Sequence, residues 1–403
     1  MSDKIPKKWL HNHPVSITSG KDSVNILNDI LPQKGNILLM TTPGFTSRGE
    51  TDRIINIIGK KRTWLYDKIT PNPQISDLDN ITQKFFLKNR KLNESSKNKG
   101  DKSGISGIVA LGGGSVIDSA KVLGVTLVLD DTTQIKELIP YPLYNIFIKQ
   151  KPFNPSQVKR KIPVIAIPTT SGTGAEVTPF ATIWDQNSKK KYSLSHFCIY
   201  PSHAILDPAL TLPLPYNETL YSGLDAISHA LESLWNINRT PITAALALQS
   251  LSITVKALPK VLEIPAKLYS RTLMQEASLL AGMAISHSRT AIAHAISYPL
   301  TIHKGVPHGL ACSFTLPCLA RNYLSRLDKK HNNMSGCIEK KIIEGVFELL
   351  QKINLPKEIY RYIKDSDILQ YIPEMFHPER AANYSEDMDY NLLTQLLKQS
   401  LEI

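Results

Sequence analysis

Four residues in the C-terminal half of the chain have the side-chain types and spacing expected of a metal site. Asp225 and His229 are four residues apart in an Ala- and Leu-rich stretch with helical periodicity, which places a carboxylate and an imidazole on one helix face. His294 and His308 follow, fourteen residues apart. Three imidazoles and one carboxylate suit a borderline divalent ion such as Fe(II) or Zn(II), with one position left open for a substrate. Together these residues favour a metal centre over four unrelated polar groups.

A glycine-rich segment, residues 112–115, has the composition of a phosphate-binding turn. It lies between an apolar run that we expect to be a strand and a helix expected to begin near Val116. Glycines at a strand-to-helix turn allow a phosphate to approach the backbone, and the helix N-terminus adds N–H donors and a favourable dipole. Asp118 is expected either to cap this helix or to contact a ribose. The segment lacks the GxGxxG spacing of common dinucleotide folds, so alone it is a weak signal.

A second segment, Pro168 to Thr178, also follows an apolar run and carries several hydroxyl groups. Its hydroxyl and N–H groups are suited to a pyrophosphate or to a nicotinamide ribose. Two such loops after strands of one sheet indicate a dinucleotide. The candidate cofactor-binding residues of the two loops are Gly112, Gly113, Gly114, Ser115, Asp118, Thr169, Thr170, Ser171 and Thr173.

The N-terminal half alternates short apolar runs with amphipathic helical stretches. This alternation predicts an α/β domain with a mostly parallel sheet and helices on both faces. Strands are expected at residues 36–41, 62–66, 107–111 and 163–167, and helices at residues 48–60, 78–87 and 116–128.

Prolines mark the expected domain boundary. Asp207-Pro208 and the prolines at 213 and 215 interrupt regular structure, and beyond Glu218 the periodicity is almost entirely helical. The sequence therefore predicts a dinucleotide-binding α/β domain at residues 1–214. An all-α domain that binds the metal and the substrate is expected at residues 215–403.

The net charge of +12 raises nucleic acid as a possible partner. The basic residues, however, are scattered in short runs at residues 88–102, 158–161 and 189–191, and no helix-turn-helix, zinc-finger or RNA-binding sheet signature accompanies them. A positive field that attracts an anionic substrate and cofactor accounts for the charge as well. We therefore expect a small anionic ligand and no nucleic-acid partner.

The sequence also bears on location. Hydrophobic residues make up 42% of the chain and charged residues 20%, which is typical of a soluble globular protein. No apolar run reaches the length of about 18 residues that suggests a membrane helix. The first residues have no apolar core of the secretory kind, and the four cysteines form no CxxC pair. A cytoplasmic protein with reduced thiols and no membrane association is expected.

From about residue 15 to the C-terminus, the chain resembles the iron-containing (group III) alcohol dehydrogenases, which have a dehydroquinate synthase-like fold. The resemblance implies that Asp225, His229, His294 and His308 bind the metal and that the two loops bind NADH or NADPH. It also implies that Lys191 lies near the nicotinamide ribose and that the protein is a homodimer. The matching motifs are Gly112-Gly-Gly-Ser-Val-Ile-Asp118, Pro168-Thr-Thr-Ser-Gly-Thr-Gly-Ala-Glu176, Leu224-Asp225-Ala-Ile-Ser-His229-Ala, His294-Ala and Pro307-His308-Gly.

Two departures from the family pattern affect the cofactor and the proton relay. Many members have a carboxylate after the strand at residues 36–41 that accepts the ribose hydroxyls; here Thr42 aligns with it, and Arg48 follows. Without that negative charge a 2′-phosphate is not repelled, and Arg48 could pair with it, so NADPH is permitted. Many members also carry a further histidine four residues after the third ligand, where this chain has Tyr298. Tyr298 is either a core aromatic residue or a catalytic or substrate-orienting hydroxyl.

Within the family, the chain looks most like the phosphonoacetaldehyde reductases, around residues 181–194 and 282–299. The expected reaction is reduction of a small aldehyde by the nicotinamide, with the metal as a Lewis acid and with Tyr298 or His287 in the proton relay. Arg289 is the candidate for binding the phosphonate, or else it is a surface or dimer-contact residue. A general alcohol or lactaldehyde-type dehydrogenase is the alternative. A lyase of the dehydroquinate synthase type is disfavoured because it lacks this set of three histidines and an aspartate.

Overall fold

The computed structural model describes residues 8–95, 104–128, 142–151, 161–330, 334–364, 368–376 and 378–402. The chain packs as two compact units. We call residues 15–223 and 257–279 the sheet unit, and residues 1–14, 224–256 and 280–403 the helical unit. The predicted division between residues 214 and 215 stays a prediction. Of the basic runs, residues 96–102 and 158–160 lie outside the described residues.

The sheet unit contains a parallel sheet, as predicted, and this sheet has six strands. Its strand order is β1-β8-β5-β4-β2-β3, and every neighbouring pair is parallel. The strands are β1 (Ser16–Ser19), β2 (Asn36–Met40), β3 (Thr63–Tyr66), β4 (Ile105–Gly112), β5 (Val164–Pro168) and β8 (His203–Leu206). The unit also contains α1 (Leu27–Ile30), α2 (Pro43–Ser47), α3 (Glu50–Ile58), α4 (Ile75–Ser95), α5 (Gly114–Thr126) and an antiparallel hairpin of β6 (Phe180–Asp185) and β7 (Lys190–Ser195).

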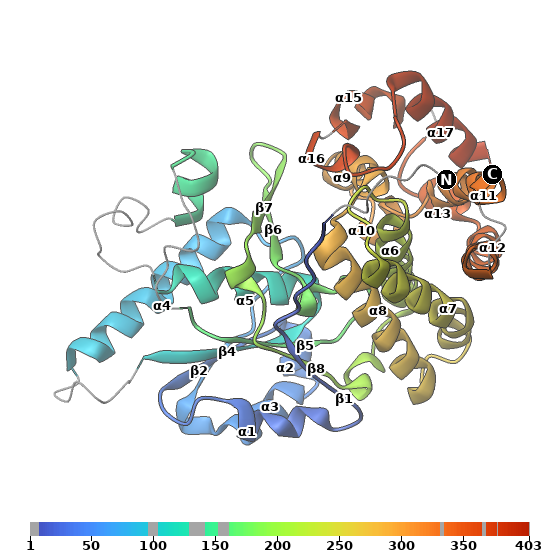
Figure 1. The fold of residues 1–403 in the computed structure, drawn as a ribbon. Coiled ribbons are helices and arrows are strands. Elements are labelled where there is room, and N and C mark those ends of the chain that lie inside the picture. Colours follow the sequence, from blue (N-terminus) through green and yellow to red (C-terminus); the bar gives the residue numbers. More distant parts are fainter. Residues whose placement is uncertain are drawn as a thin grey trace. The chain divides into compact units, whose positions relative to one another are not determined.

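Successive side chains of a strand point to opposite sides, and here the side chains on both faces of the sheet pack into an apolar core. In β2, Ile37 and Leu39 join the apolar core that includes residues of α1 and α3. Leu38 and Met40 join a second core, which includes residues of α4 and α5. Figure 1 shows α1 and α3 on one side of the sheet and α4 and α5 on the other.

The strand order creates a topological switch point between β2 and β4. From β2 the chain proceeds to β3 on one side, and then returns to β4 and β5 on the other. In open parallel sheets, ligands bind outside the carboxyl ends of the strands at such a point. Thr41, directly after β2, donates a 2.7 Å hydrogen bond from its hydroxyl to the carbonyl oxygen of Leu111 in β4. The predicted cofactor residues Thr42 and Gly113 follow these two strands.

The helical unit is built from helices among its described residues, as predicted. Three of them, α6 (Tyr216–Leu234), α7 (Pro241–Glu263) and α8 (Leu268–Ser288), have residues in both units. The remaining helices are α9 (Ile292–Lys304), α10 (His308–Ala311), α11 (Leu316–Lys330), α12 (Met334–Ile353), α13 (Leu355–Ile359), α15 (Ile372–Met375), α16 (Pro378–Ala381) and α17 (Tyr390–Glu402).

Among the described residues, α7 is the helix that is long and apolar enough to cross a membrane by length and composition. A single such helix is weak evidence, because the core helix of a soluble protein passes the same test. Ala247, Leu251 and Thr254 recur at helical spacing on α7 and are fully buried within the protein.

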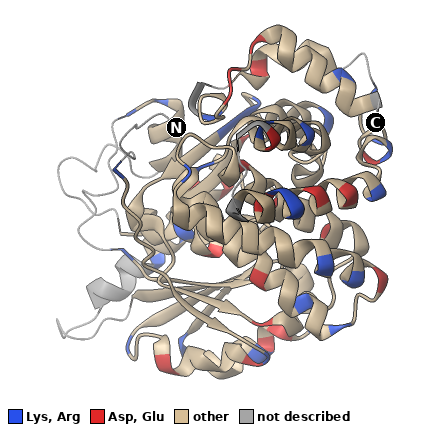
Figure 2. Ribbon diagram, turned by 45° about the vertical axis from the view of Figure 1, so that its right-hand side comes forward, with Lys and Arg blue, Asp and Glu red and all other residues tan. Residues whose placement is uncertain are grey.

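Charged residues of both signs are interspersed along the described elements. Figure 2 shows Lys and Arg scattered among Asp and Glu over the helices. This distribution matches the scattered runs seen in the sequence.

Candidate metal and cofactor sites

The four predicted metal ligands lie together in the helical unit. Asp225 and His229 come from α6, His294 from α9 and His308 from the start of α10. The Nε2 atoms of His229, His294 and His308 lie 3.6, 3.6 and 3.8 Å from Asp225 Oδ1. Two donors that share a tetrahedral ion at about 2.1 Å are about 3.4 Å apart, so these spacings suit a bound divalent metal. Their role as ligands stays a prediction.

A buried carboxylate fixes the orientation of the His294 ring. Glu232 Oε2 lies 2.7 Å from His294 Nδ1, and the same carboxylate accepts hydrogen bonds from the backbone N–H groups of Ala291 and His294. With the proton held at Nδ1, the lone pair of Nε2 is directed to the cluster. His294 Nε2 is buried and has no hydrogen-bond partner in the part of the chain that the structure describes. A metal ion would satisfy this atom.

The electrostatics of the cluster suit a cation. Burial alone raises the pKa of Asp225, but the neighbouring imidazoles of His229, His308 and His294 hold it well below its usual range. Burial also opposes ionisation of Glu232, whose pKa is nevertheless lowered by its contact with His294. Both carboxylates are therefore ionised at neutral pH, and one of them faces the three imidazoles.

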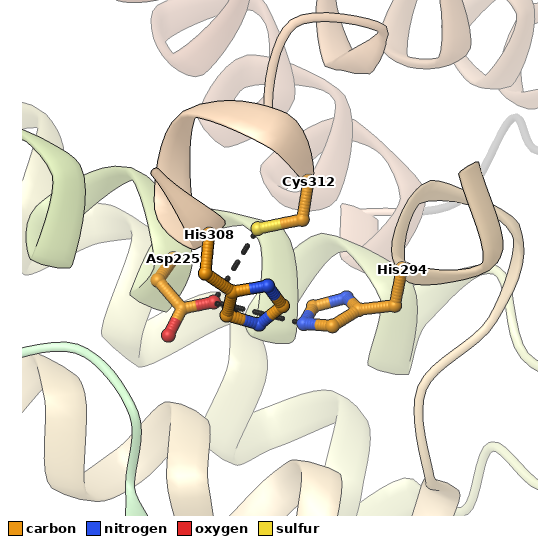
Figure 3. Close-up of side chains that lie close together, drawn as sticks. All are labelled: Asp225, His294, His308 and Cys312. Atoms are coloured by element: carbon orange, nitrogen blue, oxygen red, sulfur yellow. Dashed lines mark hydrogen bonds and ion pairs between the residues drawn. The ribbon is translucent and has the colours of Figure 1, made fainter. Parts of the chain in front are cut away.

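Sequence reasoning missed two residues of this cluster, Glu232 and Cys312. Glu232 is seven residues after Asp225 and three after His229, so helical spacing places it near the same face of α6. Cys312 is four residues after His308, the spacing that also links Asp225 to His229. Its Sγ lies 3.4 Å from Asp225 Oδ1. In Figure 3, the side chains of Asp225, His294, His308 and Cys312 point toward one another.

Tyr298 and His287, predicted for the proton relay, have different surroundings. Tyr298 is buried one turn after His294 on α9, and the Arg380 guanidinium lies 4.2 Å from its ring centre. Burial raises the pKa of Tyr298 well above its usual range, so its hydroxyl stays protonated. His287 stacks on His11 at 3.9 Å between ring centres, and its Nε2 lies 3.1 Å from the Asn12 carbonyl oxygen. The described contacts of His287 thus hold the N-terminal segment.

Arg289 lies in the short turn between α8 and α9. Its backbone φ is +66°, which is uncommon for a residue with a long side chain and costs about 1–3 kcal/mol. The turn is held by the side-chain amides of Asn236 and Asn383, which donate to the carbonyl oxygens of Arg289 and Thr290. The Arg289 side chain itself is exposed.

The two glycine-rich loops contact each other at the carboxyl edge of the sheet. Gly113 is the N-cap of α5, with φ −79° and ψ −168°, and an added Cβ would lie 3.2 Å from the Thr170 side chain. At Gly114, a Cβ would lie 2.9 Å from the side chain of Thr173. The N–H groups of Val116 and Ile117 bond to the Gly113 carbonyl oxygen, as in the first turn of a helix. The N–H groups ahead of them are those that helix N-termini offer to phosphates.

Other predicted loop residues support the same region. Asn72, after β3, donates its backbone N–H to the Ser115 hydroxyl at 3.2 Å. The backbone N–H of Thr169 donates to the Gly112 carbonyl oxygen at 3.1 Å. Ser171 is buried. These two hydrogen bonds link the segments at the carboxyl ends of β3, β4 and β5 to one another.

The expectation that Asp118 caps α5 is wrong. Asp118 lies in the second turn, and its Oδ2 accepts a 2.8 Å hydrogen bond from the backbone N–H of Thr182 in β6. Its Oδ1 lies 3.5 Å from the ammonium group of Lys121, which is fully buried and donates to the Phe180 carbonyl oxygen at 2.8 Å. Asp118 therefore anchors the hairpin to the helix. Its alternative role as a ribose contact stays a prediction.

Lys191 and Thr42, the remaining predicted cofactor residues, belong to other elements. Lys191 is half-buried in β7, and its ammonium group lies 5.2 Å from the centre of the Trp184 ring. Thr42 is the N-cap of α2, has extended backbone and makes no side-chain capping bond. The Arg48 guanidinium lies 4.6 Å from the Phe45 ring centre and is exposed. Arg48, the residue directly after α2, thus places an exposed positive charge at the end of this helix.

We expect NADPH to be used at least as well as NADH, and Thr42→Asp to shift the preference toward NADH. A carboxylate here gains a hydrogen bond to a ribose and repels a 2′-phosphate, which is worth about 1–3 kcal/mol, or about 5–150-fold. The ratio of kcat/KM for the two cofactors measures this shift. Thr46→Asp, an exposed position on the same helix, is the matched control. A natural enzyme strictly specific for NADH would contradict the role given to Thr42.

Glu176, in the second loop, makes stability depend on pH. Burial raises its pKa to about 7, against the smaller opposing effects of its backbone hydrogen bond and of Lys121. A raised pKa means that the folded state binds the proton more tightly, so this contribution is complete below pH of about 4.5 and is lost as pH rises through about 7.

We therefore expect Glu176→Gln to stabilise the protein relative to the natural chain at pH 8 but not at pH 4.5. The difference between the two pH values should approach about 3 kcal/mol, the equivalent of a shift of about 2.5 pKa units. Urea denaturation at both pH values measures it, with Glu218→Gln at an exposed position as control. A difference that does not change with pH would show that Glu176 titrates normally.

Two family models match the chain, one in each half. The family model "Iron-containing alcohol dehydrogenase" matches residues 14–208, and the model "Fe-containing alcohol dehydrogenase family, C-terminal" matches residues 219–401. The probable alcohol dehydrogenase EutG of Escherichia coli (strain K12) is 32% identical over 263 residues, 64% of this chain. The match spans 63% of the length of EutG, which is less than two thirds.

Two relatives act on aldehydes that carry an acidic group. The sulfoacetaldehyde reductase of Bilophila wadsworthia is 32% identical over 292 residues, which cover 68% of this chain and 71% of that protein. The phosphonoacetaldehyde reductase of Streptomyces viridochromogenes is 39% identical over 158 residues, which cover 39% of this chain and 40% of that protein.

The fold has close counterparts among solved structures. The sulfoacetaldehyde reductase of Bifidobacterium kashiwanohense, solved in complex with NAD+, superposes with a TM-score of 0.80 at 25% sequence identity. The match covers 98% of this chain and 99% of that one. Taken with the matches to both halves of the chain, this likeness shows that the protein belongs to the iron-containing alcohol dehydrogenase family.

Proposed function

We propose that this protein is a metal-dependent reductase that converts a small acidic aldehyde to its alcohol with NADPH or NADH. The substrate that we propose is phosphonoacetaldehyde, reduced to 2-hydroxyethylphosphonate. The observation that carries the proposal is the convergence of three imidazole nitrogens on one ionised carboxylate, Asp225, in a chain of this family. The two relatives named for acidic aldehydes support the choice of substrate class.

The residues of the helical unit would hold an Fe(II) or Zn(II) ion. When bound, the ion supplies a Lewis acid for the aldehyde oxygen. Asp225 supplies the negative charge of the donor set, and Glu232 keeps the proton of His294 at Nδ1, so that Nε2 stays available. The alcohol oxygen needs a proton, and we propose Tyr298 or His287 as its route. Tyr298 enters this step protonated, because burial raises its pKa.

The sheet unit would hold the nicotinamide cofactor along the carboxyl ends of its strands. The N-terminus of α5 offers N–H groups to the pyrophosphate, and the absence of side chains at Gly113 and Gly114 keeps space next to Thr170 and Thr173. Thr42 and Arg48 are proposed to set the preference between the two cofactors. Lys191 is proposed to contact the nicotinamide ribose.

Arg289 is proposed to bind the acidic group of the substrate. Its guanidinium is exposed and forms no ion pair with any described acidic residue, while its strained backbone is held in place by Asn236. Strained residues cluster at functional sites. The turn also continues directly into Ala291, whose N–H donates to Glu232 beside His294. A planar guanidinium matches the oxygen geometry of a phosphonate.

The experiment is a comparison of substrates in the natural protein and in Arg289→Ala. We expect KM for phosphonoacetaldehyde to rise by about 10–150-fold, the loss of charged hydrogen bonds worth about 1.5–3 kcal/mol. Reduction of propanal, which has no acidic group, should be nearly unchanged. Arg321→Ala, another exposed arginine of the helical unit, is the matched control.

Three other outcomes would redirect the assignment. Equal loss on both aldehydes would make Arg289 structural. Propanal turnover equal to that of phosphonoacetaldehyde in the natural protein would leave a general alcohol dehydrogenase. Sulfoacetaldehyde is the second candidate substrate, because the sulfoacetaldehyde reductase matches a longer part of the chain than the phosphonoacetaldehyde reductase does. A preference for sulfoacetaldehyde would mean that Arg289 binds a sulfonate instead of a phosphonate. The homodimer and the cytoplasmic location stay predictions.

A further inference from the structure

Cys312 lies inside the donor cluster rather than beside it. It follows the last residue of α10, four residues after His308, and is fully buried. Its Sγ lies 3.4 Å from Asp225 Oδ1 and 3.5 Å from the Gly309 carbonyl oxygen. In Figure 3, the sulfur of Cys312 points toward the carboxylate of Asp225, as do the imidazoles of His294 and His308.

The positions of the donor atoms fit one shared ion. One donor atom from each of Asp225, His294, His308 and Cys312 lies within 4.8 Å of the other three. A metal bound at about 2.1 Å to oxygen or nitrogen and about 2.3 Å to sulfur places neighbouring donors about 3.4–3.6 Å apart and opposite donors about 4.4 Å apart. The distance of 3.4 Å between Cys312 Sγ and Asp225 Oδ1 lies at the short end of the range for neighbouring donors. A hydrogen bond to Asp225 would explain that one distance, but not the convergence of sulfur with both imidazoles.

We propose that Cys312 is a sulfur donor to the metal ion of this site, in addition to Asp225 and the three histidines. The inference rests on the metal centre of the proposed function. As the sulfur–metal bond forms, the bond between sulfur and hydrogen breaks, and the proton leaves to solvent. No electron is transferred.

A thiolate donor changes the charge and the metal preference of the centre. Asp225 and Cys312 together neutralise a divalent ion, whereas Asp225 alone leaves one positive charge. Thiolate is a soft ligand that suits Zn(II), so the sulfur tips the choice between zinc and iron toward zinc. Cys312 is thereby a determinant of which metal this chain retains.

Cobalt substitution tests the assignment directly. Metal-free protein is loaded with one equivalent of Co(II), and its absorption spectrum is recorded without oxygen. A thiolate bound to Co(II) gives an intense charge-transfer band in the near ultraviolet, which nitrogen and oxygen donors do not give. We expect this band in the natural protein, its loss in Cys312→Ser and Cys312→Ala, and its retention in Cys318→Ser. Cys318 is also buried but is hydrogen bonded to Ser400 instead.

Metal affinity gives a second readout. Changes in residues that only support the ligands typically alter affinity by about 10–100-fold, so loss of the sulfur is expected to lower the ratio of Zn(II) to Fe(II) affinity by at least about tenfold. Circular dichroism checks that each variant is folded.

The outcomes separate this inference from the proposed function. Stoichiometric Co(II) binding by the natural protein without a charge-transfer band would overturn the sulfur ligand while leaving the metal centre intact. No Co(II) binding by the folded natural protein would refute the metal centre itself. The spectrum of the natural protein decides between these results even if neither Cys312 variant folds.

Discussion

Replacing His294 by Ala is expected to remove most of the bound metal and to lower kcat/KM by about a thousandfold or more. The substitution deletes the donor that Glu232 orients, and it leaves Asp225 with two of its three neighbouring imidazoles. A Lewis acid at the reacting oxygen is worth several kcal/mol, and about 4 kcal/mol corresponds to a thousandfold in rate. Metal content by elemental analysis and aldehyde reduction by NADPH oxidation measure the two effects.

The matched control is His303→Ala on the same helix. His303 lies nine residues after His294 on α9, and its Nε2 pairs with Glu374 at 2.9 Å, outside the cluster. This variant should keep both metal and activity. In His294→Ala, Glu232 still accepts the N–H groups of Ala291 and residue 294, so the buried carboxylate keeps two partners. Full metal content and turnover in His294→Ala would show that the metal binds elsewhere.

Sequence reasoning missed the buried strand β8. It found β3, which is only partly buried, and three strands whose side chains are buried on both faces. Continuous apolar runs at β2, β4 and β5 predict such strands, and the structure confirms them. Strand β1, Ser-Ile-Thr-Ser, was not expected because it is a mostly exposed edge strand without an apolar run. The alternation of buried Ala181 and Ile183 in β6 was a usable signal of period two, although no strand was predicted there.

The gathering of the four candidate ligands could be predicted because each belongs to a short motif with helical or family spacing. The partners of those ligands depend on tertiary packing. The pairing of His294 with Glu232 joins residues 62 positions apart, and that of Cys312 with Asp225 joins residues 87 positions apart. Asp118 shows the same limit: its position near a helix start suggested a cap, but its partner is Thr182 on a hairpin that sequence reasoning did not predict.

The second large effect is expected from Gly113→Val, which should abolish NAD(P)H binding while leaving metal content nearly intact. The backbone at Gly113 is extended, with φ −79°, so any residue could adopt it without strain. Glycine is therefore needed for space rather than for conformation. An added Cβ would lie 3.2 Å from the side chain of Thr170, and the two further methyl groups of valine would enter the space that a pyrophosphate needs at the start of α5.

Two further variants decide whether that space belongs to the cofactor or only to loop packing. Gly113→Ala combined with Thr170→Ala removes the close approach of the added Cβ to the Thr170 side chain but keeps a methyl group at the helix N-terminus. If the space serves the pyrophosphate, titration of NADPH fluorescence should still show weaker binding in the double variant than in Thr170→Ala alone. Gly345→Ala is the control, because its Cβ would meet only ordinary contacts, the nearest at 3.6 Å from Val255. Restored affinity in the double variant would mean that Gly113 serves packing against Thr170, and unchanged affinity in Gly113→Val would exclude this loop from the cofactor site.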